Sequence, residues 1–551
     1  MEKKKRKSNF IVQGSVLAAA SIIVRLIGMV YRIPLTGIIG DKGNGIYSVA
    51  YEVYSILLLL SSYSLPLAVS KLMSAMMAKG ELRNAKKYFR CAMIFAIIIG
   101  SAVALFTYFF AGTIAGTIMK SPMSTISLKV LAPAIFVVAV MGVLRGYFQG
   151  MGSMVPTAIS QVVEQIINAI VSVWAAYILF SYGELVVKMT QKKGYDSAYG
   201  AAGGTMGTLF GAAAGLISLI VIFLFFKKKF IVGSAANARS RRVDSTSVVY
   251  KTLFLTIVPV VLSTAVYNIS SVLDQAVFNR IMAGMGKSAD EYNGMWGIFS
   301  GKYRLLTNVP IAVASAMVSS TVIGVSAAVA VKNKKEVVRK TRVCIRFTMM
   351  ITIPCAVGLS VLASPILQML WSDERALPAN LLRYGSISVV LYAMSTLSNG
   401  ILQGVNRMKV PVKNAIIALV MHLILLVVLL QVFKLHVYGV VIANIFFALI
   451  MCILNARAMR RYIRGYRQEV IRTFLIPAIN STIMGLLVYW LHKGIVFITG
   501  RNGIGIVISI IAGAFVYFVG MVFMGGISER DLKGFPKGAA LVRLADKMGL
   551  L

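Results

Sequence analysis

Residues 21–34 read Ser21-Ile-Ile-Val-Arg25-Leu-Ile-Gly28-Met-Val-Tyr31-Arg32-Ile-Pro34 and place two arginines inside the first long apolar segment of the chain. In an α-helix, the step from Arg25 to Arg32 makes about two turns and roughly 10 Å of rise, so both side chains lie on nearly the same face. An arginine at the centre of a membrane helix costs about 2.5–3.5 kcal/mol on insertion scales. Arg25 lies deep in the segment and predicts a polar cavity or partner around it. Arg32 could alternatively extend to the membrane interface.

The composition outside this stretch is that of an integral membrane protein. Of the 551 residues, 58% are hydrophobic and 14% are charged. Apolar runs of about 18 residues or more predict an all-α fold with about fourteen transmembrane helices, among them 10–38, 46–78 and 295–330. No small-residue cleavage site follows the basic N-terminus, so we expect the first segment to remain as a membrane anchor.

The charge is strongly positive, with 57 Lys and Arg against 18 Asp and Glu. The basic residues gather in alternate loops, after the second, sixth, eighth and twelfth predicted helices. This pattern predicts an even number of helices and two cytoplasmic termini. It also argues against a nucleic-acid partner and favours contact with anionic membrane lipids. The four cysteines and three histidines show no metal-ligand spacing, so we expect no metal and no cofactor.

Two sequence echoes indicate an internal repeat. Gly146-Tyr-Phe-Gln149-Gly150 precedes Pro156 much as Gly400-Ile-Leu-Gln403-Gly404 precedes Pro411, and Leu65-Pro66-Leu-Ala-Val is similar to Val309-Pro310-Ile-Ala-Val. Their order is the same, which predicts two parallel six-helix lobes. The predicted organisation is an N-lobe (1–226), a basic cytoplasmic linker (227–248), a C-lobe (249–457), two further helices (458–525) and a cytoplasmic tail (526–551).

Charged residues within the predicted helices are the strongest sign of a functional site, because charges are costly there. They are Arg25, Arg32, Glu52, Arg145 and Glu164 in the first half and Asp274, Lys302 and Arg304 in the second. All but Arg145 and Glu164 are predicted at the centre or toward the outside, where they leave a cationic excess suited to phosphate. Arg145 and Glu164 could pair near the cytoplasmic face. Alternatively, all these charges form structural ion pairs.

Small residues and prolines predict features of helix packing. Glycines recur at four-residue steps at Gly203, Gly207, Gly211 and Gly215, and again at Gly142, Gly146 and Gly150. This spacing predicts close approach of helix backbones. Pro66 and Pro310 each remove a backbone hydrogen bond and predict a kink in each half, suited to a gate or to a static bend.

Catalytic motifs are weak in this sequence. Gly286-Lys287-Ser288 is like the end of a nucleotide-binding loop, but Ile281 stands where that motif needs glycine. We therefore expect a transporter rather than an enzyme, driven by an ion gradient or by the membrane potential. A membrane glycosyltransferase would want a catalytic carboxylate in a sizeable external loop, and the longest predicted one, about 182–197, offers Glu184 and Asp196.

Four segments resemble the lipid II flippases of the MurJ type. They are Arg25-Leu-Ile-Gly28-Met-Val-Tyr31-Arg32, Ser64-Leu-Pro66-Leu-Ala-Val-Ser70-Lys71-Leu72, Leu144-Arg145-Gly146-Tyr147-Phe148-Gln149-Gly150 and Gln161-Val-Val-Glu164-Gln165. The resemblance covers essentially the whole chain and points to the branch of Gram-positive bacteria, with the related stage V sporulation protein B. These proteins belong to the multidrug/oligosaccharidyl-lipid/polysaccharide (MOP) exporter superfamily.

This resemblance implies two lobes around a central cavity, with residues 458–525 forming a groove for a polyprenyl tail. It implies flipping of undecaprenyl-diphosphate-linked peptidoglycan precursor, lipid II, across the bacterial plasma membrane. The protein would act as a monomer or beside the cell-wall synthesis machinery. Family members hold the diphosphate with arginines on the first, second and eighth helices.

Several charges of this chain match the positions of that family site. Arg25 matches the first-helix arginine, Arg32 matches the next one with a one-residue offset, and Arg304, beside Lys302, is the eighth-helix counterpart. The second helix departs, because it carries Glu52 where many members have arginine. Some members bind sodium in the second lobe, which makes Asp274 the candidate for coupling to Na⁺ or H⁺.

Other transport functions stay open. A flippase for another polyprenyl-linked precursor, such as one for capsule or sporulation cortex, has the same chemistry. A multidrug or cation antiporter of the same superfamily would want acids in its cavity, whereas the predicted cavity is net positive. A non-transporting scaffold leaves the buried charges unexplained.

Overall fold

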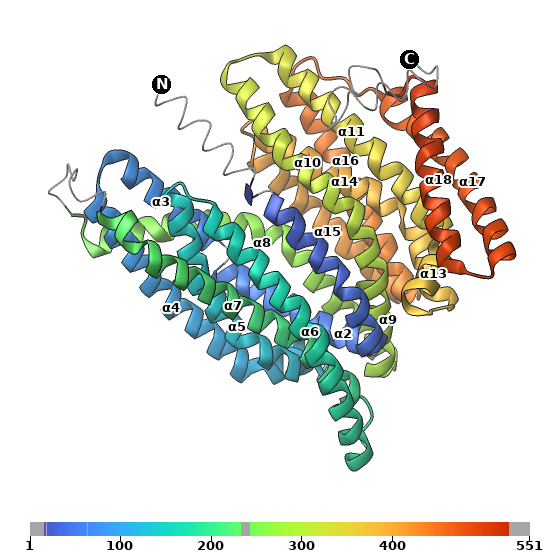
Figure 1. The fold of residues 1–551 in the computed structure, drawn as a ribbon, viewed down its shortest axis with the longest axis horizontal. Coiled ribbons are helices and arrows are strands. Elements are labelled where there is room, and N and C mark those ends of the chain that lie inside the picture. The colour runs from blue at the N-terminus through green and yellow to red at the C-terminus, as the bar shows by residue number, and fades with distance from the viewer. Residues whose placement is uncertain (1–15, 18, 63, 233–242, 528–551) are drawn as a thin grey trace. The chain divides into compact units, whose positions relative to one another are not determined.

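The structure, a computed structural model, describes residues 16–17, 19–62, 64–232 and 243–527. This part of the chain is helical and contains no strand (Figure 1). It divides into two compact units, residues 1–301 and 302–551, with the boundary inside the short π-helical segment η3 (Phe299–Tyr303). The basic N-terminus, the middle of the predicted linker and most of the predicted tail lie outside the described residues.

The first unit begins with an apolar helical segment, Ala19–Val30. It continues through α2 (Arg32–Ser61), α3 (Leu65–Lys79), α4 (Leu82–Gly112), η1 (Thr113–Ile118), α5 (Ser124–Gly150), α6 (Val155–Thr190), α7 (Tyr195–Val232), α8 (Thr246–Gly284) and α9 (Ala289–Ile298). The predicted lobes follow the sequence repeat, whereas these units follow packing. Helices α8 and α9 pack against α2 and so belong to the first unit.

The first predicted helix continues through Tyr31 into α2. Tyr31 has helical dihedral angles, and its amide donates to the Ile27 carbonyl at 3.1 Å. The real interruption comes at Gly40, whose φ of 66° and ψ of −176° break the helical path. Only glycine adopts such angles without strain. Gly40 therefore separates the first two predicted helices, 10–38 and 46–78.

Pro66 lies at a helix start, not inside one helix. Helix α2 ends at Ser61, and Pro66 occupies the first turn of α3, where its missing N–H leaves no helical hydrogen bond unmade. Pro310, by contrast, lies inside α10 (Arg304–Ala330). The two prolines that sequence placed as equivalent kinks thus have different local structures.

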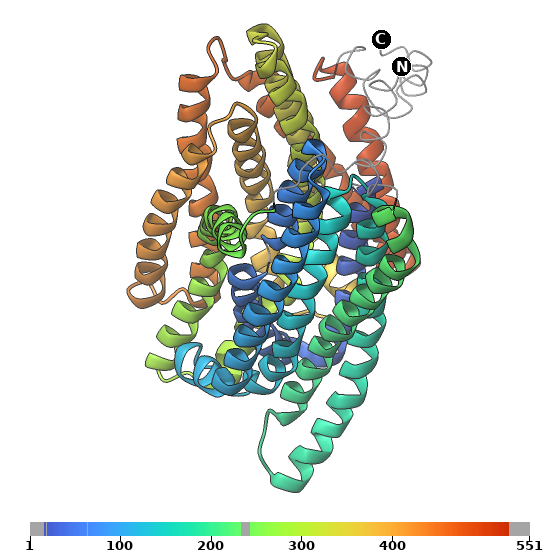
Figure 2. The same cartoon turned by 90° about the vertical axis from the view of Figure 1, so that its left-hand side faces the viewer.

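The glycine spacing reports close helix packing, as predicted. Helices α6 and α7 run side by side (Figures 1 and 2). A Cβ added to Gly207 would lie 2.5 Å from the Asn168 carbonyl oxygen, and one on Gly211 would lie 2.6 Å from that of Glu164. These helices also extend further than predicted, so that the expected loop 182–197 narrows to residues 191–194.

We expect Gly207→Val to destabilise the first unit by at least about 3 kcal/mol, because the new side chain meets backbone that has no room to move. The measurement is the thermal unfolding midpoint of the purified protein in detergent. Gly112→Val is the matched control, since an added Cβ there meets nothing within 4 Å. Equal midpoints for the two variants would contradict the close packing of α6 on α7.

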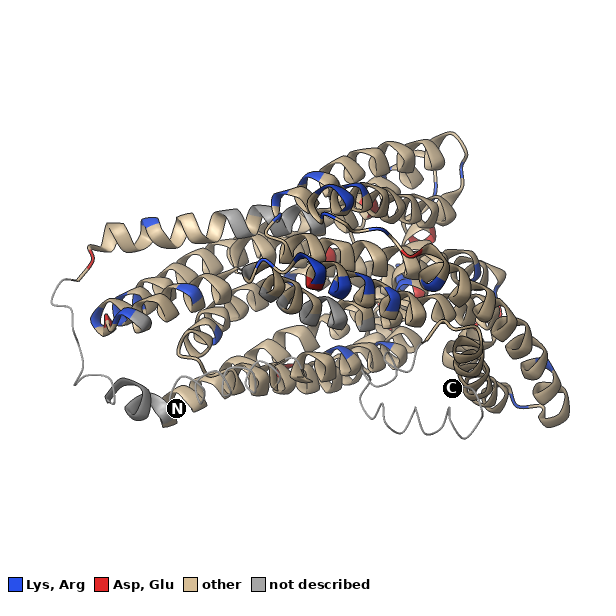
Figure 3. Cartoon of the chain, turned by 90° about the horizontal axis from the view of Figure 1, so that it is seen from above, with Lys and Arg blue, Asp and Glu red and all other residues tan. Residues whose placement is uncertain are grey.

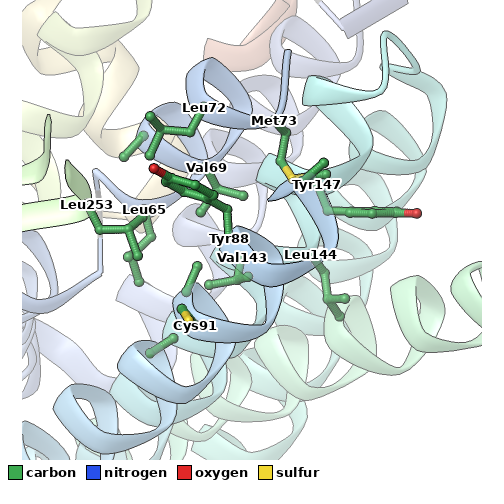
Figure 4. Close-up of a cluster of buried hydrophobic side chains, with 14 of the residues drawn as sticks. Leu65, Val69, Leu72, Met73, Tyr88, Cys91, Val143, Leu144, Tyr147 and Leu253 are labelled. Carbon is green, nitrogen blue, oxygen red and sulfur yellow. The ribbon is translucent and has the colours of Figure 1, made fainter. Parts of the chain in front are cut away.

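The core of the first unit sits where α3, α4, α5 and α8 meet (Figure 4). Leu65 and Val69 of α3 face Tyr88 and Cys91 of α4, and Leu253 of α8 closes the cluster. These side chains are all buried. The spacing of apolar residues along α3 explains this position, because Leu65, Val69 and Met73 recur at four-residue steps on one face.

The second unit comprises η3 from Lys302 onward and the helices that follow it. These are α10 (Arg304–Ala330), α11 (Lys334–Val361), α12 (Ala363–Trp371), α13 (Ala376–Gly385), α14 (Ile387–Gly404), α15 (Lys409–Gln431), α16 (His436–Tyr462), η4 (Ile471–Leu475), α17 (Ile476–Thr499) and α18 (Asn502–Phe523). The repeated Gly-x-x-Gln-Gly motif has the same local setting in both units. It ends α5 and α14, and the proline after it lies in the first turns of α6 and α15.

The described residues include ten helices long and apolar enough to cross a membrane, or eleven if the bent pair α13 and α14 forms one span. Two shorter apolar helices, Ala19–Val30 and Thr246–Val258, add to these. The chain is therefore a multi-pass membrane protein. The count of about fourteen helices and the cytoplasmic position of both termini stay predictions.

Candidate functional site

The two arginines of the opening stretch have different surroundings in the first unit. Arg25 is exposed and forms no ion pair or hydrogen bond with any described residue. Arg32 is half-buried, and its guanidinium carbon lies 5.1 Å from the ring centre of Tyr47 and 5.4 Å from that of Tyr51. Such cation–π contacts stabilise a charge away from water. Arg32 thus has an aromatic partner, while Arg25 keeps its hydrogen-bonding capacity.

Two predicted acids lie on helices that pack together in the first unit. Ser271 of α8 donates from Oγ to Glu52 Oε2 of α2 at 2.6 Å. Asp274 lies one turn further along α8 and is buried, with 3% of its surface exposed. The described residues contain no group of three or more His, Cys, Asp or Glu side chains that could hold a metal ion. The role of Asp274 in ion coupling stays a prediction.

Arg145 and Glu164 form an ion pair, which the sequence analysis offered as one possibility. Arg145 of α5 contacts Glu164 of α6 at 2.7 Å, and its Nε also donates to Ser160 Oγ at 3.0 Å. Both charged side chains are largely shielded from solvent, and each neutralises the other. This geometry connects two helices at the Gln149-Gly150 end of α5, and a role in gating remains a prediction.

Lys302 has an acidic partner that sequence reasoning missed. Its Nζ lies 2.6 Å from Asp373 Oδ2, and both side chains are buried. Arg375 also donates to Asp373, at 2.6 and 2.8 Å. Burial raises the pKa of Asp373, but the hydrogen bonds from Arg375 and Lys302 outweigh it and hold that pKa well below its usual range. No local pattern links residues 71 positions apart, so this contact had no sequence signal.

This arrangement changes the setting of the predicted phosphate residues in the second unit. Lys302 would have to share its ammonium with Asp373 in order to bind a phosphate. Arg304 begins α10 two residues later and is half-buried. The assignment of Lys302 and Arg304 to a headgroup site stays a prediction.

We expect Asp373→Asn to destabilise the protein by about 3–5 kcal/mol, because it leaves a buried ammonium without its charged partner. The lowered pKa means that the carboxylate is charged and stabilising at every pH above about 4, so unfolding at pH 7 captures the whole effect. The control is Asp290→Asn, which breaks the exposed Lys42–Asp290 pair and should cost at most about 1 kcal/mol. A similar unfolding midpoint for both variants would show that the buried pair contributes little.

An apolar cavity of about 590 Å³ lies in the second unit. Residues of α10, α11, α12, α17 and α18 line it. Its lining residues include Pro310, Met350, Pro354, Gly358, Met484 and Tyr517. We call this cavity the apolar groove. Its volume lies in the range of about 300–1,000 Å³ typical of ligand sites, and its walls suit a hydrocarbon.

Proline and glycine explain why space remains between these helices. Pro310 and Pro354 lie inside α10 and α11, where each lacks a backbone N–H, and Gly358 presents no side chain to the groove. A Cβ added to Gly358 would meet nothing within 4 Å. The sequence predicted helices α17 and α18 as an addition to the repeat, and Figure 1 shows them side by side at the end of the chain.

Lys and Arg exceed Asp and Glu along the chain (Figure 3), and the structure gathers some of them in a second cavity. This cavity, of about 450 Å³, lies between the start of α11 and the loop that follows α16. Sequence reasoning treated these residues as a topology signal. The helical spacing from Lys334 to Arg346 could have shown that several of them share one side of α11.

Comparisons with known proteins agree with this architecture. A family model described as polysaccharide biosynthesis protein matches residues 12–323, and a MatE model matches residues 305–428. The chain is 26% identical over 550 residues to the lipid II flippase MurJ of Bacillus subtilis (strain 168), covering 94% of this chain and 97% of that protein. It is 22% identical over 536 residues to stage V sporulation protein B of the same strain, covering 96% and 98%.

Solved structures share the fold at low sequence identity. The inward closed conformation of a lipid II flippase MurJ aligns with a TM-score of 0.66 and 16% identity, covering 92% of this chain and 98% of that one. An inward-facing MATE multidrug resistance transporter of the MOP superfamily aligns with a TM-score of 0.64 and 16% identity, covering 83% and 100%. The helices described above therefore form a fold that is shared with a lipid II flippase and with a multidrug resistance transporter.

Proposed function

Because the chain belongs to the polysaccharide biosynthesis protein family, we propose that it is a flippase for a polyprenyl-diphosphate-linked glycan. The proposed substrate is lipid II, the undecaprenyl-diphosphate-linked peptidoglycan precursor. The protein would move it from the inner to the outer leaflet of the bacterial plasma membrane by alternating access.

The apolar groove is the observation that carries this proposal. A transporter for small polar solutes has no use for an apolar groove of about 590 Å³. A polyprenyl chain needs such a surface, because it must stay in an apolar environment while its headgroup crosses. The groove uses α17 and α18, the two helices outside the six-plus-six repeat.

Arg25 is the proposed contact for the diphosphate. It projects from an apolar helix and has no partner among the described residues, so its guanidinium is available to an anionic ligand. A guanidinium binds phosphate oxygens in a bidentate manner. Arg32 and Arg304 are the secondary candidates, Arg32 with aromatic support from Tyr47 and Tyr51.

The driving force is proposed to be an ion gradient or the membrane potential. Moving one charge across 100 mV is worth about 2.3 kcal/mol, which is enough to bias a transporter cycle. Asp274 is the proposed residue for coupling to Na⁺ or H⁺, and its burial on α8 supports this role. The protein would work as a monomer, beside the cell-wall synthesis machinery.

A multidrug or cation antiporter is the second candidate, favoured by the MatE match over residues 305–428. A cationic drug would need acids in its cavity, whereas the charged residues predicted at the centre of this bundle have a cationic excess. A flippase for a sporulation or capsule precursor is closer in chemistry, and the similarity to stage V sporulation protein B favours the sporulation precursor.

Complementation separates these candidates. The native chain is expressed in a strain whose own lipid II flippase is depleted, and lipid II accessible from outside the cell is measured. We expect growth and external lipid II to return. Growth failure together with restored export of a different lipid-linked glycan would favour the sporulation or capsule precursor. Drug resistance without external lipid II would favour the antiporter.

A further inference from the structure

The second cavity of the second unit is strongly basic and takes no part in the function proposed above. Five cations on α11 and one in the loop after α16 line it, namely Lys334, Lys335, Arg339, Arg342, Arg346 and Arg464. Glu469 is the single acid among its lining residues. We call this cavity the basic cleft. The positive-inside pattern predicts that it faces the cytoplasm.

The Arg342 guanidinium of the basic cleft is incompletely satisfied by the protein. Arg339 pairs with Glu336 at 2.7 and 2.8 Å. Arg342 reaches Glu469 at 3.5 Å, too far for a strong contact. The Nε of Arg342 is buried and has no hydrogen-bond partner among the described residues. A buried donor of this kind costs free energy unless a ligand satisfies it.

Topology alone does not account for this arrangement. Positively charged loops need to lie on the cytoplasmic side, but they gain nothing from lining a cavity or from burying a guanidinium nitrogen without a partner. Like charges held together in a cleft also repel one another. An anion that accepts several hydrogen bonds would remove both costs, and phosphate is the anion that arginine binds best.

The basic cleft and the apolar groove are lined by successive parts of α11. The cleft uses Val338, Arg342 and Arg346, and the groove uses Met350, Pro354 and Gly358, all at four-residue steps. One step along an α-helix is about 6 Å of rise and about 40° of rotation, so Arg346 and Met350 are neighbours on the helix surface. A ligand with a phosphate head and a long apolar tail can therefore occupy both cavities.

We propose that the basic cleft is a loading site, which binds the diphosphate of a polyprenyl-linked substrate while the polyprenyl chain enters the apolar groove. The inference rests on the proposed function, since it assigns the first, cytoplasmic step of the same transport. Arg342 and Arg346 bind the phosphate oxygens. The headgroup then leaves for the arginine site of the first unit. Ordinary anionic phospholipids carry the same phosphate chemistry on a different tail.

Binding to the purified full chain in neutral-lipid nanodiscs tests this proposal. The probes are undecaprenyl diphosphate, phosphatidylglycerol and inorganic pyrophosphate. We expect the double variant Arg342→Gln/Arg346→Gln to bind undecaprenyl diphosphate at least about tenfold more weakly than the native chain. Arg342→Lys/Arg346→Lys keeps the charge but loses bidentate contact, and should fall between the two.

The matched control is Arg467→Gln/Arg472→Gln, which removes two exposed charges near the basic cleft that do not line it. It should bind within about twofold of the native chain. Unfolding midpoints verify that every variant is folded. Unchanged binding of undecaprenyl diphosphate to the Arg342/Arg346 variants would overturn the proposal.

The other probes separate the sources of phosphate. Equal affinity for phosphatidylglycerol would mean a general site for anionic lipids and would overturn a loading role. Equal affinity for pyrophosphate would mean that the polyprenyl tail adds nothing to binding. This result would contradict the entry of the tail into the groove. Arg25→Ala should keep binding at the basic cleft while losing transport. The binding measurements test the loading site, and complementation tests the flippase assignment. A failure of either proposal can therefore be distinguished from a failure of the other.

Discussion

Arg25→Ala should abolish flipping while leaving a folded protein. In complemented cells, external lipid II should fall on the order of 100-fold, because a lost charge-assisted phosphate contact costs about 2–5 kcal/mol. The folded state should be untouched, since Arg25 is exposed and no described residue pairs with it. The measurements are external lipid II in the depletion strain and the unfolding midpoint of the purified variant.

The conservative variant sharpens this test. Arg25→Lys keeps the positive charge but loses the planar fork of donors, so we expect partial activity if bidentate contact with phosphate matters. Arg32→Lys is the comparison, because Arg32 already lies over Tyr47 and Tyr51 and an ammonium can keep part of that cation–π contact. Full export by Arg25→Ala would remove Arg25 from the headgroup site.

The opening helix illustrates what sequence can predict about a membrane protein. Periodicity placed Arg25 and Arg32 on one continuous helix, and the helical dihedrals of Tyr31 agree with this. Spacing also predicted close approach of helix backbones at Gly207 and Gly211, and the structure shows that the partner is α6. Both inferences depend on residues close in sequence, where helix geometry fixes their relation.

Contacts between distant residues were beyond such reasoning. The stacking of Arg32 on Tyr47 depends on the break at Gly40, and the pairing of Lys302 with Asp373 depends on how η3 meets the loop between α12 and α13. The apolar groove likewise arises from side chains on five helices. Its existence was implied by a family resemblance, and its walls could be named from the structure alone.

Basic residues show a different limit. Their alternation between loops predicts the membrane topology, and that interpretation hides any further role of these residues. The basic cleft emerges because α11 carries its cations beyond the loop and into the first turns of a membrane helix, where Arg464 and Glu469 lie beside them. A charge run can therefore serve topology and ligand binding at once, and geometry is needed to separate these roles.

The second large effect that we expect is the loss of transport on filling the apolar groove. Gly358→Phe places a large ring in the groove, next to Pro354 and Leu362. The position tolerates it, since an added Cβ meets nothing within 4 Å. A polyprenyl tail that cannot enter the groove stays in the bulk lipid and no longer contributes to substrate binding. External lipid II in complemented cells should therefore fall at least about tenfold.

The control for this variant is Gly494→Phe on α17. Gly494 is exposed, does not line the groove, and also meets nothing within 4 Å of an added Cβ. It adds the same ring to a lipid-facing surface of the same unit and should leave export unchanged. Gly513 is unsuitable for this purpose, because a Cβ there would lie 2.6 Å from Val488 Cγ2 and the variant would test packing instead.

Comparison of substrates makes the groove experiment specific. If the groove holds the polyprenyl chain, Gly358→Phe should weaken binding of undecaprenyl diphosphate to the purified protein and leave binding of pyrophosphate unchanged. Arg25→Ala should leave the binding of both probes at the basic cleft unchanged and should lower export instead, because it removes a phosphate contact outside the cleft and no apolar surface. Normal export by Gly358→Phe, with a folded protein, would mean that the tail travels outside the groove and that the cavity between α10, α11, α12, α17 and α18 has another occupant.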